Sequence, residues 1–183
     1  MDVPQTWLVR PKKAQYDLDN IQLGVLPVHE RAEGVQAIFS LDYLVIEGHA
    51  RETITMSPPR GLQLQLGTTV PPDSNDSSVA IADTQVTANL GYLQFRVKPG
   101  VFKLEIRPGR GRDIFTIESV GNEGWESPDV DTAGDEVTLT SFEGLTLYPR
   151  FKRVPGMEGV DVLAAEVSTT ADSKGFLGDV LSG

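Results

Sequence analysis

The stretch YLQFRVKPGVFKLEI, residues 92–106, decides the fold class of this chain. In residues 92–97, and again in 102–106, apolar side chains alternate with polar ones, which indicates strands that each bury one face. Pro99-Gly100 stands between them and predicts a type II turn, because proline fixes φ at the second turn position and glycine accepts a positive φ at the third. We therefore expect these two strands to be antiparallel neighbours.

Similar runs recur along the chain. The alternating ones are residues 62–66, 114–117, 137–140 and 145–148. Residues 38–41 and 43–46 are more continuously apolar, so we expect burial on both of their faces. Pro-Gly pairs at 108–109 and 155–156 predict the same kind of turn. Short, unequal strands with Pro-Gly turns predict an all-β fold, and an antiparallel β-sandwich in preference to a barrel.

The length of 183 residues and an apolar fraction of 39% fit one domain. We expect residues 1–167 to form the sandwich, with residues 1–35 either inside it or as an N-terminal extension of it. Residues 168–183 are mostly small and polar and are predicted to be a tail or linker. Helical signals are weak, and residues 160–167 fit a strand or one to two helical turns.

The net charge of −10 argues against nucleic acid as a partner, because a phosphate backbone requires clustered cations. The densest basic stretch, Arg107 to Arg112, lies among glycines and is interpreted as a turn. No run approaches the roughly 20 apolar residues that span a bilayer, so no membrane contact is expected. Met1–Pro4 does not resemble a signal peptide, so a secretory location would require this chain to be part of a longer protein.

Residues for catalysis are scarce. The chain has two histidines, His29 and His49, and no cysteine, which excludes thiolate zinc sites and three-histidine sites. No Gly-x-Ser-x-Gly sequence provides a nucleophile for His49, so we interpret His49 as a strand-end residue with a local hydrogen bond. Residues 109–112 are predicted to be a turn with no helix after it, and therefore no phosphate site.

Two pairs of aspartates have the Asp-x-Asp spacing of metal-dependent sugar-nucleotide transferases, Asp17 with Asp19 and Asp129 with Asp131. Neither follows a parallel strand in a βαβ unit, so both are interpreted as solvated loop carboxylates. Residues 129–136 only partly match a calcium loop, because Ala133 stands where an oxygen ligand belongs, and a weak calcium site is the alternative. We therefore predict no catalytic, cofactor-binding or metal-binding residue.

One modification signal is present. Asn75-Asp76-Ser77 is an acceptor sequence for N-glycosylation, and it lies in the polar loop 70–78. Such tripeptides also arise by chance, and an ordinary Asx turn is the alternative interpretation.

Several collinear motifs resemble one known family, the UDP-glucose:glycoprotein glucosyltransferases, in the region upstream of their catalytic domain. The main ones are LVIEGHARE (44–52), PPRGLQL (58–64), ANLGYLQF (88–95) with Lys98-Pro99-Gly100, GRGRDIF (109–115), SFEG (141–144) and LYPR (147–150). Shorter matches at 2–4, 7–9 and 17–21 extend the resemblance over roughly residues 1–165.

The resemblance implies a large enzyme of the endoplasmic-reticulum lumen, with thioredoxin-like domains, two β-sandwiches and a C-terminal glucosyltransferase domain. Such enzymes transfer glucose from UDP-glucose to high-mannose N-glycans on misfolded glycoproteins in quality control. Calcium and UDP-glucose are then expected in the catalytic domain, which lies outside this chain. Neither Asp pair lies in a matching motif, so no catalytic or metal residue is carried over, and the chain alone is not expected to be an enzyme.

Two hypotheses on function follow. In the first, the domain is a rigid sandwich that positions the transferase domain, so that its partners are adjacent domains of the same polypeptide. In the alternative, it binds exposed hydrophobic surface on misfolded clients directly. Candidate outward aromatic residues are Trp7, Tyr16, Trp125 and Phe176, although packing over a sandwich edge is the simpler interpretation. A carbohydrate-binding sandwich has little support, because the two tryptophans lie far apart in sequence.

Overall fold

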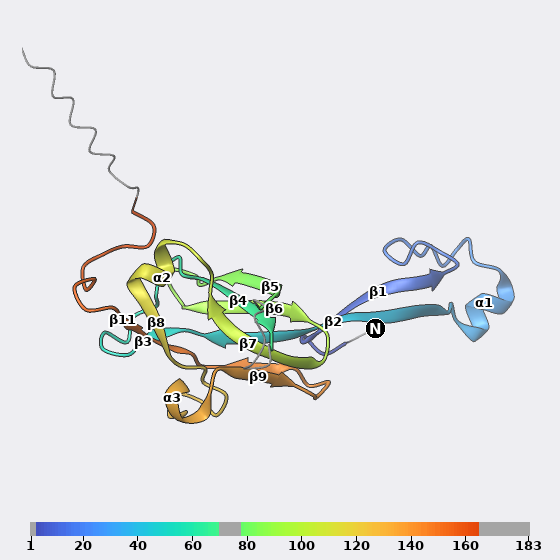
Figure 1. Cartoon of the computed structure of the whole chain (residues 1–183). Helices are drawn as coiled ribbons and strands as arrows, with labels where there is room; N and C mark the ends of the chain where they lie inside the picture. The colour runs from blue at the N-terminus through green and yellow to red at the C-terminus, as the bar shows by residue number, and fades with distance from the viewer. Residues whose placement is uncertain (1–2, 70–77, 165–183) are drawn as a thin grey trace, which may run out of the picture.

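The computed structural model describes residues 3–69 and 78–164, and it confirms the all-β fold class (Figure 1). Helices are few and short: α1 (Val28–Glu33), α2 (Arg110–Ile114) and α3 (Val130–Ala133). The strands are β1 (Trp7–Ala14), β2 (Ala37–His49), β3 (Arg51–Glu52), β4 (Gln63–Thr68), β5 (Ala80–Gln85), β6 (Tyr92–Val97), β7 (Gly100–Ile106), β8 (Phe115–Ser119), β9 (Glu136–Leu139), β10 (Leu145–Leu147) and β11 (Arg150–Arg153).

The strands form three sheets. In the first, β2 is central, with β6 along one edge and β1 followed by β10 along the other. The second has the order β5-β4-β7-β9, and the third is the small sheet β3-β11-β8. Pairing is antiparallel except between β2 and β10 and between β3 and β11. The segment β2–β3 and the segment β10–β11 therefore run side by side, in the same direction, from the first sheet into the third.

The core lies between the first two sheets and continues under the third. The alternation predicted for residues 92–97 and 62–66 is confirmed, because every apolar residue of these runs except Tyr92 is at most 1% exposed. The largest fully buried side chains include Phe95, Phe115 and Phe151. Complete burial of one such side chain stabilises a fold by about 1.5–3 kcal/mol, so the apolar strand faces account for the layered architecture.

The predicted pairing within residues 92–106 is wrong. β6 pairs with β2 in the first sheet, whereas β7 pairs with β4 and β9 in the second. Gly100 does not adopt the positive φ of a type II turn and instead begins β7. The Pro99-Gly100 link therefore carries the chain from one sheet to the other.

The other two Pro-Gly turns differ from each other. At 154–157 the prediction is confirmed, since Gly156 has φ 89° and the Met157 amide donates to the Val154 carbonyl at 3.0 Å. At 107–110 it is wrong, because Gly109 has φ 135° and precedes α2. The expectation that no helix follows residues 109–112 is therefore also wrong, although α2 is only five residues long.

The continuous apolar run at 38–46 is one long strand, β2, and only part of it is buried. Leu44, Val45 and Ile46 are at most 2% exposed, as predicted, but Ile38 is 56% and Tyr43 44% exposed. The reason is that the first half of β2 pairs with β1 alone in a ribbon that projects from the sandwich and carries α1 at its far end (Figure 1). We call residues 7–43 the arm.

Some elements were not predicted. The sequence gives no alternation for β1, β5 or β11, and α3 lies in the acidic stretch 121–135, where no helix was predicted. Of the segment 160–167, residues 160–164 form neither a strand nor a helix, and the remainder lies outside the described residues, as does the predicted tail 168–183. Across the described ranges, no helix has the length and apolarity to cross a membrane.

Candidate functional site

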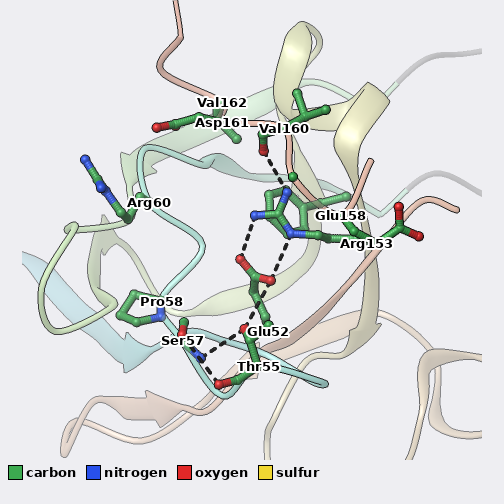
Figure 2. Close-up of a pocket in the computed structure, with 12 residues that line it drawn as sticks. Glu52, Thr55, Ser57, Pro58, Arg60, Arg153, Glu158, Val160, Asp161 and Val162 are labelled. Carbon is green, nitrogen blue, oxygen red and sulfur yellow. Dashed lines mark hydrogen bonds and ion pairs between the residues drawn. The ribbon is translucent and has the colours of Figure 1, made fainter. Parts of the chain in front are cut away.

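A depression of about 310 Å³ lies at one end of the sandwich, between the loop after β3 and the chain that follows β11 (Figure 2). We call residues 154–164 the C-terminal segment. Thr55, Ser57 and Arg60 line one side of the depression, and Glu158 to Val162 of the C-terminal segment line the other. Its floor holds a charged pair, Glu52 and Arg153.

Glu52 ends β3 and Arg153 ends β11, so the parallel pairing of these strands places the two side chains together. Arg153 donates from Nη2 to Glu52 Oε1 at 2.9 Å and from Nε to Glu52 Oε2 at 3.0 Å. The Glu52 side chain is only 8% exposed and that of Arg153 21%. A bidentate pair with so little water around it is strongly oriented.

The remaining Arg153 nitrogen binds the C-terminal segment. Nη1 donates to the Met157 carbonyl at 2.8 Å and to the Val160 carbonyl at 2.7 Å. The guanidinium also lies 4.6 Å from the centroid of the Phe115 ring, which is buried below it. The hydrogen bond to Glu52 raises the pKa of Arg153 against the opposing effect of burial. Arg153 therefore links sandwich core, strand end and C-terminal segment in one network.

Further contacts hold the C-terminal segment along its length. Arg110 Nε, from α2, donates to the Asp161 carbonyl at 3.2 Å. The Leu163 side chain fits against Gly61, where a Cβ atom added to the glycine would lie 2.5 Å from the leucine. Met157, Val160 and Val162 are partly buried and pack on the core. These apolar and polar contacts together fix the path by which the chain leaves the sandwich.

Glu158, which also lines the depression, uses its carboxylate to bind the backbone of the C-terminal segment. Its carboxylate accepts the Gly156 amide at 3.1 Å. Hydrogen bonds from its own backbone amide and from that of Gly156 lower the pKa of Glu158, and nearby Arg153 adds to this effect. With all three Arg153 nitrogens engaged and the carboxylates of Glu52 and Glu158 accepting hydrogen bonds, the arrangement is suited to holding backbone in place.

A second arginine organises the acidic loop 121–135. Arg150 donates to the carbonyls of Trp125 and Ser127 and forms ion pairs with Glu118 at 3.3 Å and Asp129 at 3.1 Å. Asp135 pairs instead with Lys103 at 3.2 Å. Two of the carboxylates that suggested a calcium loop, Asp129 and Asp135, are thus directed to different cations. No group of three or more metal-ligating side chains occurs within residues 3–69 and 78–164.

The other residues singled out in the sequence lie apart from one another. Asp17 accepts the Asp19 amide at 3.2 Å in a turn of the arm. His49 ends β2, where its ring lies edge-on to that of Tyr92 at 5.7 Å, a ring contact in place of the expected hydrogen bond. Asn75 lies outside the described residues.

The candidate aromatic residues are mostly packed. Trp7 donates from Nε1 to the Phe142 carbonyl at 2.6 Å, and the Trp125 ring lies 5.1 Å from Tyr148. Tyr16 donates to Glu30 Oε2 at 2.7 Å, and Phe176 lies outside the described residues. Packing over sandwich edges is therefore the better interpretation of Trp7 and Trp125.

Sequence reasoning missed Glu52 and Arg153. They are 101 positions apart, and no local spacing connects them. The only signal was indirect: Glu52 closes one motif of the family resemblance, and Arg153 stands two residues before the Pro-Gly turn at 155–156.

Comparison with known proteins gives the family. The model of the UDP-glucose:Glycoprotein Glucosyltransferase family matches residues 47–164. A Drosophila melanogaster UDP-glucose:glycoprotein glucosyltransferase is 36% identical over 176 residues, 94% of this chain and 10% of the relative. Human UDP-glucose:glycoprotein glucosyltransferase 1 is 36% identical over 177 residues, 96% of this chain and 10% of the relative.

Another relative matches over a shorter stretch. The probable UDP-glucose:glycoprotein glucosyltransferase A of Dictyostelium discoideum is 40% identical over 117 residues, 64% of this chain. The chain spans about a tenth of the length of the fly and human relatives. The resemblance inferred from the motifs is thereby confirmed, and the chain belongs to the UDP-glucose:glycoprotein glucosyltransferase family.

Proposed function

We propose that this chain is a non-catalytic β-sandwich domain of a glucosyltransferase of the endoplasmic-reticulum lumen and that it positions the transferase domain. The whole enzyme would reglucosylate high-mannose N-glycans on misfolded glycoproteins, with UDP-glucose and calcium bound in the transferase domain. The family resemblance implies a region upstream of that domain, so the C-terminal segment would lead toward it.

One observation carries the proposal: the C-terminal segment is fixed to the sandwich. Arg153 holds the Met157 and Val160 carbonyls while Glu52 holds Arg153. Leu163 packs on Gly61 at the far end of the segment. A segment held this way keeps the orientation of the sandwich as far as residue 164, so that less free chain would separate the sandwich from the domain that follows.

The test is the paired substitution Glu52→Leu with Arg153→Met in the full-length enzyme. Replacing both partners by apolar residues avoids leaving one buried charge alone, so stability is largely preserved, but both carbonyl contacts to the C-terminal segment are lost. We expect glucose transfer to a denatured glycoprotein to fall at least fivefold. Hydrolysis of UDP-glucose, which needs only the transferase site, should change less than twofold.

The matched control is Arg10→Met with Asp42→Leu, which removes an ion pair between β1 and β2 in the arm, with side chains 73% and 28% exposed. It should leave both activities unchanged. Normal transfer to the glycoprotein by the Glu52/Arg153 variant, in an enzyme with an unchanged melting temperature, would show that the contact has no positioning role. The 183-residue chain alone should show no UDP-glucose hydrolysis.

A further inference from the structure

The far end of the arm exposes apolar side chains on a well-defined scaffold. Leu23, Val25 and Val28 are 72%, 76% and 78% exposed, and they lie around the start of α1. Only Leu26 among their neighbours is buried, at 4% exposure. We call residues 21–28 the arm tip, and it stands clear of the sandwich in Figure 1.

Polar contacts hold the arm tip in this conformation. Glu30 accepts hydrogen bonds from Tyr16 Oη at 2.7 Å and from Gln15 Nε2 at 3.2 Å. Arg31 donates to the Leu26 carbonyl at 2.8 Å and to the Gly24 carbonyl at 3.1 Å. The side chain of Arg31 thus holds the backbone of the arm tip, while the apolar side chains of Leu23, Val25 and Val28 remain exposed to solvent. An apolar surface that is ordered before binding loses little conformational entropy on burial.

Leu26 is the one buried residue of the arm, so the arm has no apolar core comparable to that of the sandwich. From Arg10 to Ala14 every residue of β1 is exposed, although the ladder with β2 continues to its end at Ala14 and Ala37. An isolated two-stranded ribbon is marginally stable at best in water, and a helix of six residues such as α1 does not stand alone. Within residues 3–69 and 78–164, the contacts that stabilise this part of the arm are therefore few.

We propose that the arm tip docks permanently onto an apolar surface of another domain of the same polypeptide. A ribbon that is marginal by itself needs a partner that is always present, and a covalently linked domain has a high effective concentration. About nine-tenths of the length of the fly and human relatives lies outside the matched region, which leaves ample chain to supply that surface. This inference rests on the proposed function only in taking the chain as one domain of a longer enzyme.

The charge of the arm fits such an occupant. Acidic and basic side chains are nearly balanced over residues 7–43, and Arg10 is already paired with Asp42 at 2.8 Å. Neither an anionic membrane surface nor a phosphate backbone would be selected by this surface. Its distinguishing property is exposed apolar area, which is the property of interfaces that stay assembled.

The experiment uses the full-length enzyme with single cysteines introduced at Val28 and, as a control, at Ile54. Both side chains are almost equally exposed in this structure, 78% and 81%. The chain itself has no cysteine, so a maleimide adduct within it reports only the introduced residue. Labelling is followed by mass spectrometry of the corresponding peptides. Leu23→Cys, with Leu90→Cys as its control, provides a second matched comparison.

We expect Val28→Cys to react at least fivefold more slowly than Ile54→Cys in the full-length enzyme and at an equal rate in the 183-residue chain. A smaller difference in the full-length enzyme overturns the proposal. Protection in the 183-residue chain that grows with its concentration would identify a second copy as the occupant and overturn it too. Protection only after addition of a denatured glycoprotein would identify clients, the alternative function, and would also overturn it. Labelling does not depend on activity, so failure here is distinguishable from failure of the positioning role.

Discussion

The two ends of this molecule are built in opposite ways. At the end where the chain leaves the sandwich, Arg153 binds backbone carbonyls while Met157 and Val160 pack inward on the core. At the arm tip, Arg31 also binds backbone carbonyls, but Val25 and Val28 face solvent. An arginine can therefore fix a loop at either end of the molecule. Only in the C-terminal segment do the apolar side chains of that loop pack on the core of this chain.

Ion pairs show the same contrast. The pair Glu52–Arg153 has side chains that are 8% and 21% exposed, whereas Arg10 and Asp42 in the arm are 73% and 28% exposed. Water and salt screen the arm pair, but they reach the sandwich pair poorly. The same chemistry therefore has a much larger energetic consequence in the sandwich than in the arm.

The largest expected difference concerns apolar truncation. Phe151→Ala should destabilise the chain by about 3–5 kcal/mol, because Phe151 is fully buried and a cavity remains. Ile38→Ala in the arm should change stability by less than about 0.5 kcal/mol, because Ile38 is 56% exposed. Urea denaturation of the 183-residue chain measures both. Similar losses for the two variants would mean that the arm has a core comparable to that of the sandwich.

Breaking one partner of each ion pair should give a smaller contrast. Arg153→Met leaves Glu52 buried without its counter-charge and frees the Met157 and Val160 carbonyls, so we expect a loss of about 3 kcal/mol. Arg10→Met should cost less than about 1 kcal/mol. Thermal melts in low and high salt provide the measurement, and only the Arg10 effect should diminish with salt. A loss below about 1 kcal/mol for Arg153→Met would contradict the importance given to this contact.

What the sequence predicted and what it missed follow from the range of the underlying interactions. Alternation in residues 92–97 and 62–66 is a local pattern imposed by the strand period, and it identified buried faces correctly. Alternation does not specify the neighbouring strand. The chain after Pro99 could turn back or cross to the opposite sheet, and the structure shows that it crosses.

The candidate site and the arm depended on contacts that no local pattern contains. Glu52 and Arg153 meet because the parallel pairing of β3 and β11 places Glu52 beside Phe151, two residues before Arg153, although the pair is 101 positions apart in sequence. β1 has the sequence WLVRPKKA, in which Pro11 and adjacent lysines obscure strand alternation. The apolar run at 38–46 was correctly identified as a strand, but its burial depends on which part the second sheet covers.

The smallest expected contrast is the response to pH. In the sandwich, burial alone would raise the pKa of Glu105, but hydrogen bonds from Gln65 and Ser78, both at 2.8 Å, together with Lys103 and Arg112, lower it. In the arm, the hydrogen bond to Glu30 raises the pKa of Tyr16 above its ordinary value, with burial and the charge of Glu30 adding to it. The sandwich should therefore be sensitive to acid and the arm to alkali.

The signs can be tested separately with Glu105→Gln and Tyr16→Phe. A carboxyl whose folded pKa is lowered stabilises the fold above its ordinary value of 4.5 and loses this contribution as the pH falls. The stability gap between wild type and Glu105→Gln, below about 1 kcal/mol at pH 7, should shrink toward pH 3 in urea denaturation. A phenol whose folded pKa is raised stabilises below its ordinary value of 10.0 and loses this contribution as the pH rises through the folded value. Hydrogen exchange, corrected for intrinsic rates, measures the protection of the arm amides. The protection in wild type should fall to that in Tyr16→Phe only above pH 10. A difference in protection that stays constant with pH would show that the Tyr16–Glu30 bond does not organise the arm tip.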